Sequence, residues 1–120
     1  MNGLSETTDL RFLQDKQVGQ ICLSIHQVIL RCPPDVTVSV ESTLEYIRHG
    51  AETGKVWTPG SDLAGLSLET LLGQMIKQVE ILPKGTLKLL FSSNDTLVIH
   101  DDNKAFESYQ LTHGSRCIVV

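Results

Sequence analysis

The sequence predicts a mainly β protein of the α+β class, built as an antiparallel sandwich or partly open barrel of seven to nine short strands with two short helices. Three observations lead to this prediction. Apolar and polar residues alternate in several short runs, turn-forming residues separate these runs, and the order of the runs recurs in the second half of the chain. The recurrence favours an internal duplication.

The first predicted unit covers about residues 8–47. Thr8 or Asp9 is expected to cap a short helix, because both side chains accept hydrogen bonds from free backbone amides. Strands are then expected over 21–25, 28–32 and 36–40, and the sequence Pro-Pro-Asp at 33–35 is typical of a turn between the last two. Residues 48–60, with three glycines and a proline, are predicted to be linker-like.

The second predicted unit covers about residues 62–111. A short helix is expected over 67–72, with Ser67 as its N-cap and Gly73 as its C-terminal stop. Strands are expected over 76–82, 87–91 and 97–101, followed by 106–111 and a C-terminal strand over 116–120.

The two units are matched residue by residue. The tetrapeptide VGQI at 18–21 resembles LGQM at 72–75, an offset of 54 residues. The second strand of each unit matches at an offset of 59 and the third at 61, so the offset grows as loop insertions would make it grow. All 120 residues are expected to form one domain, because two independent cores would be too small.

The alternation also predicts a core. One face of each strand is apolar, and a one-residue slip in pairing would bury Lys88 or Glu41 instead. The residues expected to be buried together are Val36, Val38, Leu87, Leu89, Phe91, Leu97 and Ile99.

Composition restricts the class of protein. Apolar residues make up 41% of the chain, charged residues 20%, and the net charge is −4, which argues against nucleic acid as the main partner. No run of roughly 20 apolar residues could span a membrane, and no signal peptide is visible. We therefore expect a cytoplasmic protein whose cysteines, Cys22, Cys32 and Cys117, are free thiols; a Cys22–Cys32 bridge across a hairpin is the alternative.

No motif in the chain points to catalysis. The four histidines stand in no metal-binding spacing, and neither a GxSxG elbow, a CxxC pair nor a glycine-rich phosphate loop occurs. The sequence therefore predicts a protein that is not an enzyme and that has no catalytic residue, no cofactor and no metal ion.

Acidic residues recur after the third strand of both units, and these are the candidates for partner binding. We expect them to share one accessible side with Tyr109; a solvated loop and a divalent-cation site are the alternatives. Trp57, the only tryptophan, is either a plug on the core or an exposed contact anchor. The full set of candidates is Glu41, Glu45, Trp57, Asp101, Asp102, Glu107 and Tyr109.

Three features carry a resemblance to a known group: the two Leu/Val-Gly-Gln segments, the sequence VSVES at 38–42, and FESYQL at 106–111. They resemble small bacterial proteins of unknown function that are similar to the immunity-type partners encoded beside polymorphic toxins. The resemblance extends over residues 18–120 and implies a non-catalytic inhibitor with no active-site residue to transfer.

Two functional classes follow. The first is a cytosolic interaction protein, most concretely an immunity-type inhibitor that binds a basic toxin domain through complementary charge. The second is a small-ligand-binding protein or an enzyme whose site forms only in the folded chain. Pairing of the final strand with a second copy would give a homodimer, and this oligomeric state stays open.

Overall fold

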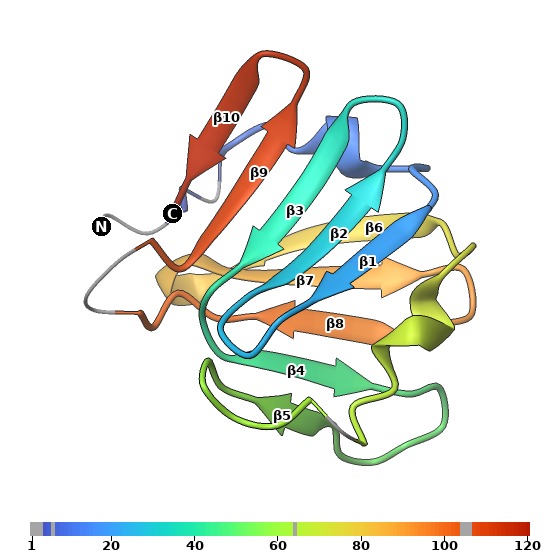
Figure 1. Ribbon diagram of the computed structural model, residues 1–120. Coiled ribbons are helices and arrows are strands. Elements are labelled where there is room, and N and C mark those ends of the chain that lie inside the picture. The colour runs from blue at the N-terminus through green and yellow to red at the C-terminus, as the bar shows by residue number, and fades with distance from the viewer. Residues whose placement is uncertain (1–3, 6, 64, 104–106) are drawn as a thin grey trace.

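Ten strands in the part of the chain that the structure describes form two antiparallel sheets of five strands each (Figure 1). The computed structural model describes residues 4–5, 7–63, 65–103 and 107–120. Sheet 1 has the order β1-β2-β3-β9-β10 and sheet 2 the order β5-β4-β8-β7-β6. The strands of sheet 1 are β1 (Gln20–Leu23), β2 (Val28–Cys32), β3 (Val36–Val40), β9 (Tyr109–His113) and β10 (Arg116–Val119). Those of sheet 2 are β4 (Leu44–Ile47), β5 (Lys55–Trp57), β6 (Ile76–Leu82), β7 (Thr86–Phe91) and β8 (Thr96–Ile99).

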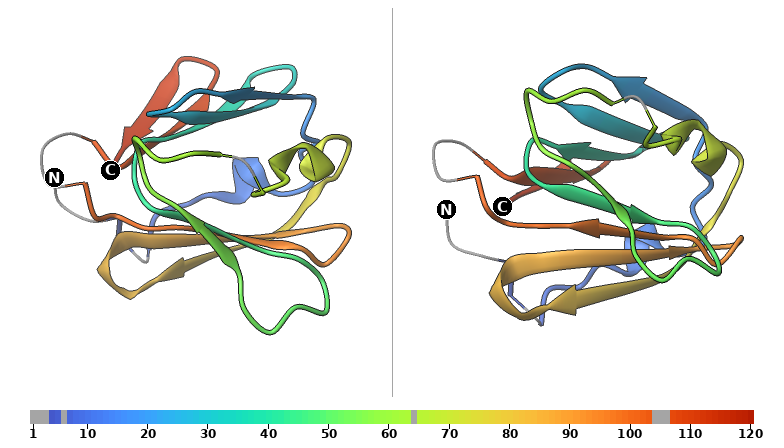
Figure 2. Two further views of the ribbon diagram at one scale, coloured as in Figure 1. Left: turned by 60° about the horizontal axis from the view of Figure 1, so that its bottom comes forward. Right: turned by 90° about the horizontal axis from the view of Figure 1, so that it is seen from below.

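The prediction of a mainly β protein with antiparallel strands is confirmed. The two sheets lie as two layers, which fits the sandwich alternative, and they do not close into a barrel (Figure 2). The described residues form ten strands rather than seven to nine, because β4 and β5 were not foreseen. β5 lies inside the stretch predicted to be linker-like, where Trp57 pairs with Leu44 in register.

Each sheet combines three strands from one half of the chain with a hairpin from the other half. After β1-β2-β3 the chain crosses into sheet 2 and forms the hairpin β4-β5 beside β8. After β6-β7-β8 it crosses back into sheet 1 and forms the hairpin β9-β10 beside β3. The two halves therefore exchange their hairpins.

Strand register shows which residues take the same place in the two halves. Val28 pairs with Val40 in sheet 1, and Leu87 pairs with Ile99 in sheet 2, so Val40 corresponds to Ile99. The offset is therefore 59 for the third strand as well as for the second. The offset of 61 expected for the third strand is therefore wrong by two residues. A shift of two residues leaves the same face of the strand inward, so the alternation of apolar residues does not reveal the error.

The segments that precede β1 and β6 also correspond, but not as expected. The Gly73 amide donates to the Val18 carbonyl (2.8 Å), and the Asp15 amide donates to the Ile76 carbonyl (2.7 Å). Asp15 thus takes the place of Gly73, and both have a positive φ, 66° and 83°. The alignment of Gly19 with Gly73 is wrong, because Asp15 supplies the left-handed residue that glycine supplies in the second half.

The short helices are 3-10 turns: η1 (Arg11–Leu13), η2 (Leu68–Leu71) and η3 (Pro83–Gly85). Ser67 does not cap η2, because its φ of 59° places it in the left-handed region and its side chain makes no capping hydrogen bond. Asp9 does bind the start of η1, where its Oδ1 accepts a hydrogen bond from the Arg11 amide at 3.1 Å.

The core lies between the two sheets. Burial alternates along β2, β3, β4, β7 and β8, so every second side chain points inward. All seven residues predicted for the core are buried, at 2% exposure or less, and this prediction is confirmed. Val36, Val38, Leu87, Leu89, Phe91, Leu97 and Ile99 belong to one hydrophobic cluster.

The segments before β1 and β6 cover the two open sides of the layers (Figure 2). On one side Leu10 and Leu13 are buried, and the Phe12 ring stacks on His113 of β9 with centroids 5.0 Å apart. On the other side Leu68 and Leu71 are buried, and the Gly60 amide donates to the Ile25 carbonyl beyond β1. This covering leaves the outer faces of the sheets and the two crossovers accessible.

Candidate functional site

The candidate site lies where the chain passes between the sheets. The Glu41 amide, just after β3, donates to the Ser108 carbonyl at 2.8 Å. The His100 amide, just after β8, donates to the Thr43 carbonyl at 3.0 Å. These reciprocal bonds hold the two crossovers side by side, although they are about 60 residues apart in sequence. We call residues 41–43, 100–103 and 107–108 the crossover region.

Three of the predicted carboxylates are brought together in the crossover region. Asp102 accepts from the Thr43 amide through Oδ1 (3.0 Å) and from the Thr43 hydroxyl through Oδ2 (2.5 Å). Asp101 Oδ1 accepts from the Ser108 hydroxyl at 2.7 Å. Glu41 Oε1 accepts from Gln27 Nε2 at 3.0 Å. Glu41 and Asp101 are half-buried and Asp102 is exposed, so all three side chains keep access to solvent.

Asn103 links the two crossovers and was missed in the sequence. Its Nδ2 donates to the Glu41 carbonyl at 2.8 Å, and its backbone amide donates to Ser108 Oγ at 3.1 Å. Asn and Asp commonly bind nearby backbone in turns, which is the one local signal that the sequence held. The hydrogen-bond partners of Asn103, Glu41 and Ser108, are brought near it only by the strand order. No local sequence pattern could therefore have identified them.

Glu107 and Glu45 lie at the border of this region. Glu107 is half-buried and directly precedes Ser108. Glu45 lies on β4, where it pairs with Val56 on one side and Val98 on the other, so its side chain is on the outer face of sheet 2. Glu45 is two residues beyond Thr43, and therefore points to the same side of the strand as Thr43.

Trp57 and Tyr109 do not lie on the surface. Trp57 is 1% exposed and its Nε1 donates to the Ser61 carbonyl at 3.1 Å. Of the two alternatives for Trp57, the structure therefore confirms the plug on the core and contradicts the exposed contact anchor. Tyr109 is also 1% exposed, and its hydroxyl donates to the Gly85 carbonyl at 2.6 Å. Burial raises the pKa of the Tyr109 hydroxyl. Neither ring can contact a partner while the fold is intact.

The carboxylates of the crossover region have no cationic partner within the part of the chain that the structure describes. The ion pairs found there lie elsewhere, between Asp9 and Arg11 at 2.9 Å and between Asp35 and His113 at 3.4 Å. The hydrogen-bond donors that Glu41, Asp101 and Asp102 meet are neutral amides and hydroxyls. Among the described residues, the region therefore presents negative charge that no cation offsets.

A second polar network is closed to solvent. Asp95, which follows β7, is 5% exposed and accepts from the Tyr46 hydroxyl (2.6 Å) and from the His49 amide (2.8 Å). Burial raises the pKa of the Asp95 carboxyl, but the hydrogen bonds outweigh burial, so the pKa lies below its usual value. Burial, with the Asp95 bond, raises the pKa of Tyr46 to about 12. The network joins β4, β8 and, through Thr70, η2.

Other chemistry-bearing residues are dispersed. Among residues 4–5, 7–63, 65–103 and 107–120, no group of three or more His, Cys, Asp or Glu is arranged to hold a metal ion. Cys22 faces Ile29 across the β1-β2 hairpin while Cys32 points into the core, so the alternative of a Cys22–Cys32 bridge is wrong and all three cysteines are free. Burial raises the pKa of Cys32 to about 11.

Comparison of the chain with protein-family models, with curated proteins and with solved structures finds no match. Within the described ranges, no helix is long and apolar enough to cross a membrane.

Proposed function

We propose that this protein is a non-catalytic, cytosolic interaction protein of the immunity type, which binds a basic surface on a partner such as a toxin domain. The crossover region is the binding surface in this proposal. Glu41, Asp101 and Glu107 carry the contact, and Asp102 holds the crossover in shape through Thr43.

One observation carries the proposal: carboxylates from segments about 60 residues apart gather at the crossovers without a cation from the described residues. Neighbouring carboxylates repel each other, and a positive surface would relieve that repulsion on binding. Complementary charge raises the rate of encounter and selects against partners of the wrong sign. The overall charge of −4 acts in the same direction.

The test is affinity capture with charge-matched variants. A crossover variant carries Glu41→Gln, Asp101→Asn and Glu107→Gln, which remove three charges but keep acceptor oxygens for Gln27 and Ser108. A control variant removes three exposed charges elsewhere, by Glu52→Gln, Glu69→Gln and Glu80→Gln.

We expect a basic protein to be retained by the wild type and by the control variant but lost from the crossover variant. Equal retention on all three proteins would contradict this binding surface. Recovery of a tightly held small molecule, with no protein partner, would contradict the proposed function itself.

We also propose that the two halves arose by duplication of one unit. The exchanged hairpins, the equal strand registers and the paired bonds of Asp15 and Gly73 support this origin. In this proposal Gln17 and Met75 are equivalent residues of the two units. They pair with each other in an antiparallel bridge.

We also propose that β10 pairs with the β10 strand of a second copy of the chain. β10 is an edge strand of sheet 1, and Cys117 and Val119 on it are exposed. Sedimentation at micromolar concentration tests it: a dimer is expected, and a clean monomer would exclude edge pairing.

A further inference from the structure

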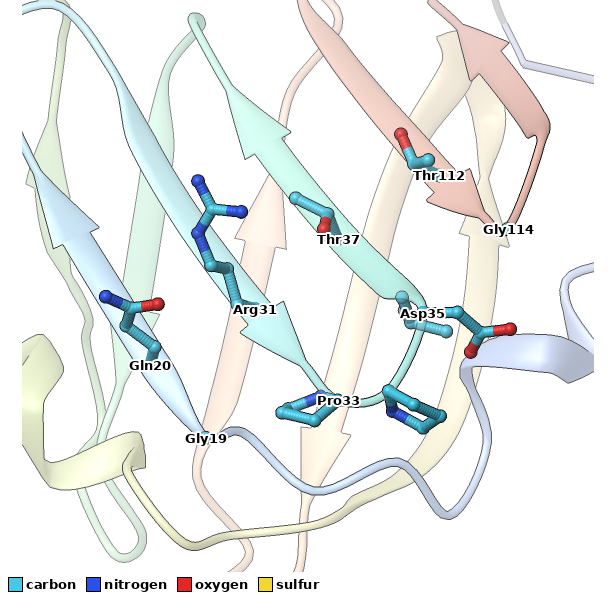
Figure 3. A pocket seen from close by; sticks show the side chains of 10 residues that line it. Gly19, Gln20, Arg31, Pro33, Asp35, Thr37, Thr112 and Gly114 are labelled. Carbon is cyan, nitrogen blue, oxygen red and sulfur yellow. The ribbon is translucent and has the colours of Figure 1, made fainter.

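The outer face of sheet 1 is nearly free of charge. Its strands direct ten side chains outward in two cross-strand rows, and Arg31 is the only charged residue in these rows. One row follows the register Gln20, Arg31, Thr37, Thr112 and Cys117. Figure 3 shows the first four of these residues. All five side chains of this row can donate a hydrogen bond, and directly paired residues on neighbouring strands lie within reach of one ligand.

Four residues of this row, Gln20, Arg31, Thr37 and Thr112, line a hollow of about 700 Å³. Residues of the β2-β3 turn, from Pro33 to Asp35, stand at one end of it (Figure 3). Gly19 and Gly114 border it without side chains that could fill it. Ligand sites for small molecules commonly have volumes of 300–1,000 Å³ by order of magnitude, and this hollow is of that size.

Two donors in the hollow, Arg31 and Gln20, lack acceptors among the described residues, whereas the Thr112 hydroxyl lies 3.9 Å from its acceptor, Cys117 Sγ. Within the described residues, neither the Arg31 guanidinium nor the Gln20 amide makes a hydrogen bond or an ion pair. Asp35, the acidic residue at the rim, is engaged with His113, whose Nε2 lies 3.4 Å from its Oδ2. The guanidinium is therefore available in a protein that carries more acidic than basic residues.

We propose that this hollow binds a small organic anion that bears a carboxylate or phosphate group. Arg31 takes the anionic group, because its planar N–H donors match two oxygens of such a group at once. Thr37, Thr112 and Gln20 bind hydroxyl or carbonyl groups on the rest of the ligand. The site lies on the outer face of sheet 1 and does not depend on the proposed binding of a basic partner at the crossovers.

The test is a titration followed by the backbone amide spectrum of the labelled full chain. Three probes are used: inorganic phosphate, glycerol 3-phosphate and citrate, with glycerol as the uncharged control. We expect saturable shifts confined to Gly19, Arg31, Thr37 and Thr112 for at least one organic anion, and none for glycerol. Binding of citrate alone assigns the site to carboxylates, and binding of glycerol 3-phosphate alone assigns it to phosphates.

Matched variants identify the group responsible. Arg31→Gln should weaken the binding about tenfold or more, because a hydrogen-bonded charge is lost. Arg48→Gln removes one exposed positive charge far from the hollow and should leave affinity unchanged. Arg31→Lys keeps the charge without the planar fork and should fall between the two. Because Arg31 is exposed, the spectra of these variants should otherwise match the wild type.

Several outcomes would overturn the proposal. Shifts that do not saturate, or that respond equally to phosphate and to both organic anions, would indicate an adventitious ion only. Equal affinity in Arg31→Gln and the wild type would remove Arg31 from the site. Equal binding of glycerol would show that charge is not recognised.

Discussion

Asp95 shows how a single side chain can be misjudged from local sequence. Residues 92–95 are typical of a turn, and the turn is present, since the Phe91 amide donates to the Asp95 carbonyl at 2.9 Å. The Asp95 side chain, however, is buried against Tyr46 and His49, which belong to the other half of the chain. Only the pairing of β4 with β8 brings these residues together, so the sequence alone could not reveal the contact.

We expect Asp95→Asn to lower the free energy of unfolding by about 1–3 kcal/mol, because one buried donor then loses its acceptor. The loss should depend on pH. The pKa of Asp95 in the folded chain is below its usual value of 3.8, so its contribution is complete above that value and disappears as the pH falls through the lower folded pKa. Urea denaturation at pH 7 and near pH 3 measures both effects. A difference between the two proteins that does not shrink in acid would show that the carboxylate is not the stabilising form.

Phe91 is a residue whose role the alternation did predict. It is fully buried on β7, and its ring contributes to the cluster between the sheets. Phe91→Ala should cost about 3–5 kcal/mol, enough to unfold much of a marginally stable domain. Chemical denaturation measures the loss, and a value below about 1 kcal/mol would mean that the site collapses around the missing ring or is not packed as described.

At the scale of elements, the sequence predicted every strand except β4 and β5, which form one hairpin. Leu87, Leu89 and Phe91 share one face of β7 in a regular pattern. β5 has three residues, of which only Trp57 is buried, so it has no period to detect. Its place in the sheet depends on pairing with β4, which is a non-local contact.

The crossovers explain why the predicted acidic residues are not equivalent. Asp102 binds the amide and the hydroxyl of Thr43, whereas Glu107 has no such bonds among the described residues. Asp102→Ala should therefore lower the free energy of unfolding by about 1–3 kcal/mol. Glu107→Ala, as the matched loss of a carboxylate, should change it by about 0.5 kcal/mol or less.

Thermal or urea unfolding of the two variants measures this difference. It also decides how the binding surface should be tested. A charge reversal at Asp102 would disturb the crossover as well as the charge, whereas neutral isosteres at Glu41 and Asp101 preserve their hydrogen bonds. Equal stability of the two alanine variants would contradict the structural role of Asp102.

At the scale of the molecule, the two halves are joined by exchange rather than by a linker. The meander β1-β2-β3 is completed by the hairpin β9-β10, and the meander β6-β7-β8 by the hairpin β4-β5. The repeat expected from the sequence matched Gly19 with Gly73, whereas the strand registers and the bonds of Asp15 and Gly73 relate the two halves at an offset of 58 or 59. The exchange of hairpins could not be predicted, because the alternation within a strand shows which face is buried but not which sheet the strand joins.

The exchange also determines the candidate site. Both crossovers run between the same pair of sheets, and the bonds donated by the Glu41 and His100 amides show that they lie side by side. Any carboxylate placed just after β3 or β8 is therefore brought to one place. In this way the overall topology produces a charged surface from residues that no local motif connects.

The proposed function is tested most directly by the salt dependence of binding to the captured partner. The dissociation constant would be measured at low and at high ionic strength for the wild type, the crossover variant and the control variant with the same loss of charge. We expect the crossover variant to bind about tenfold more weakly at low salt and to respond less to added salt, while the control follows the wild type. Equal affinity and equal salt dependence in all three proteins would contradict a binding surface at the crossovers.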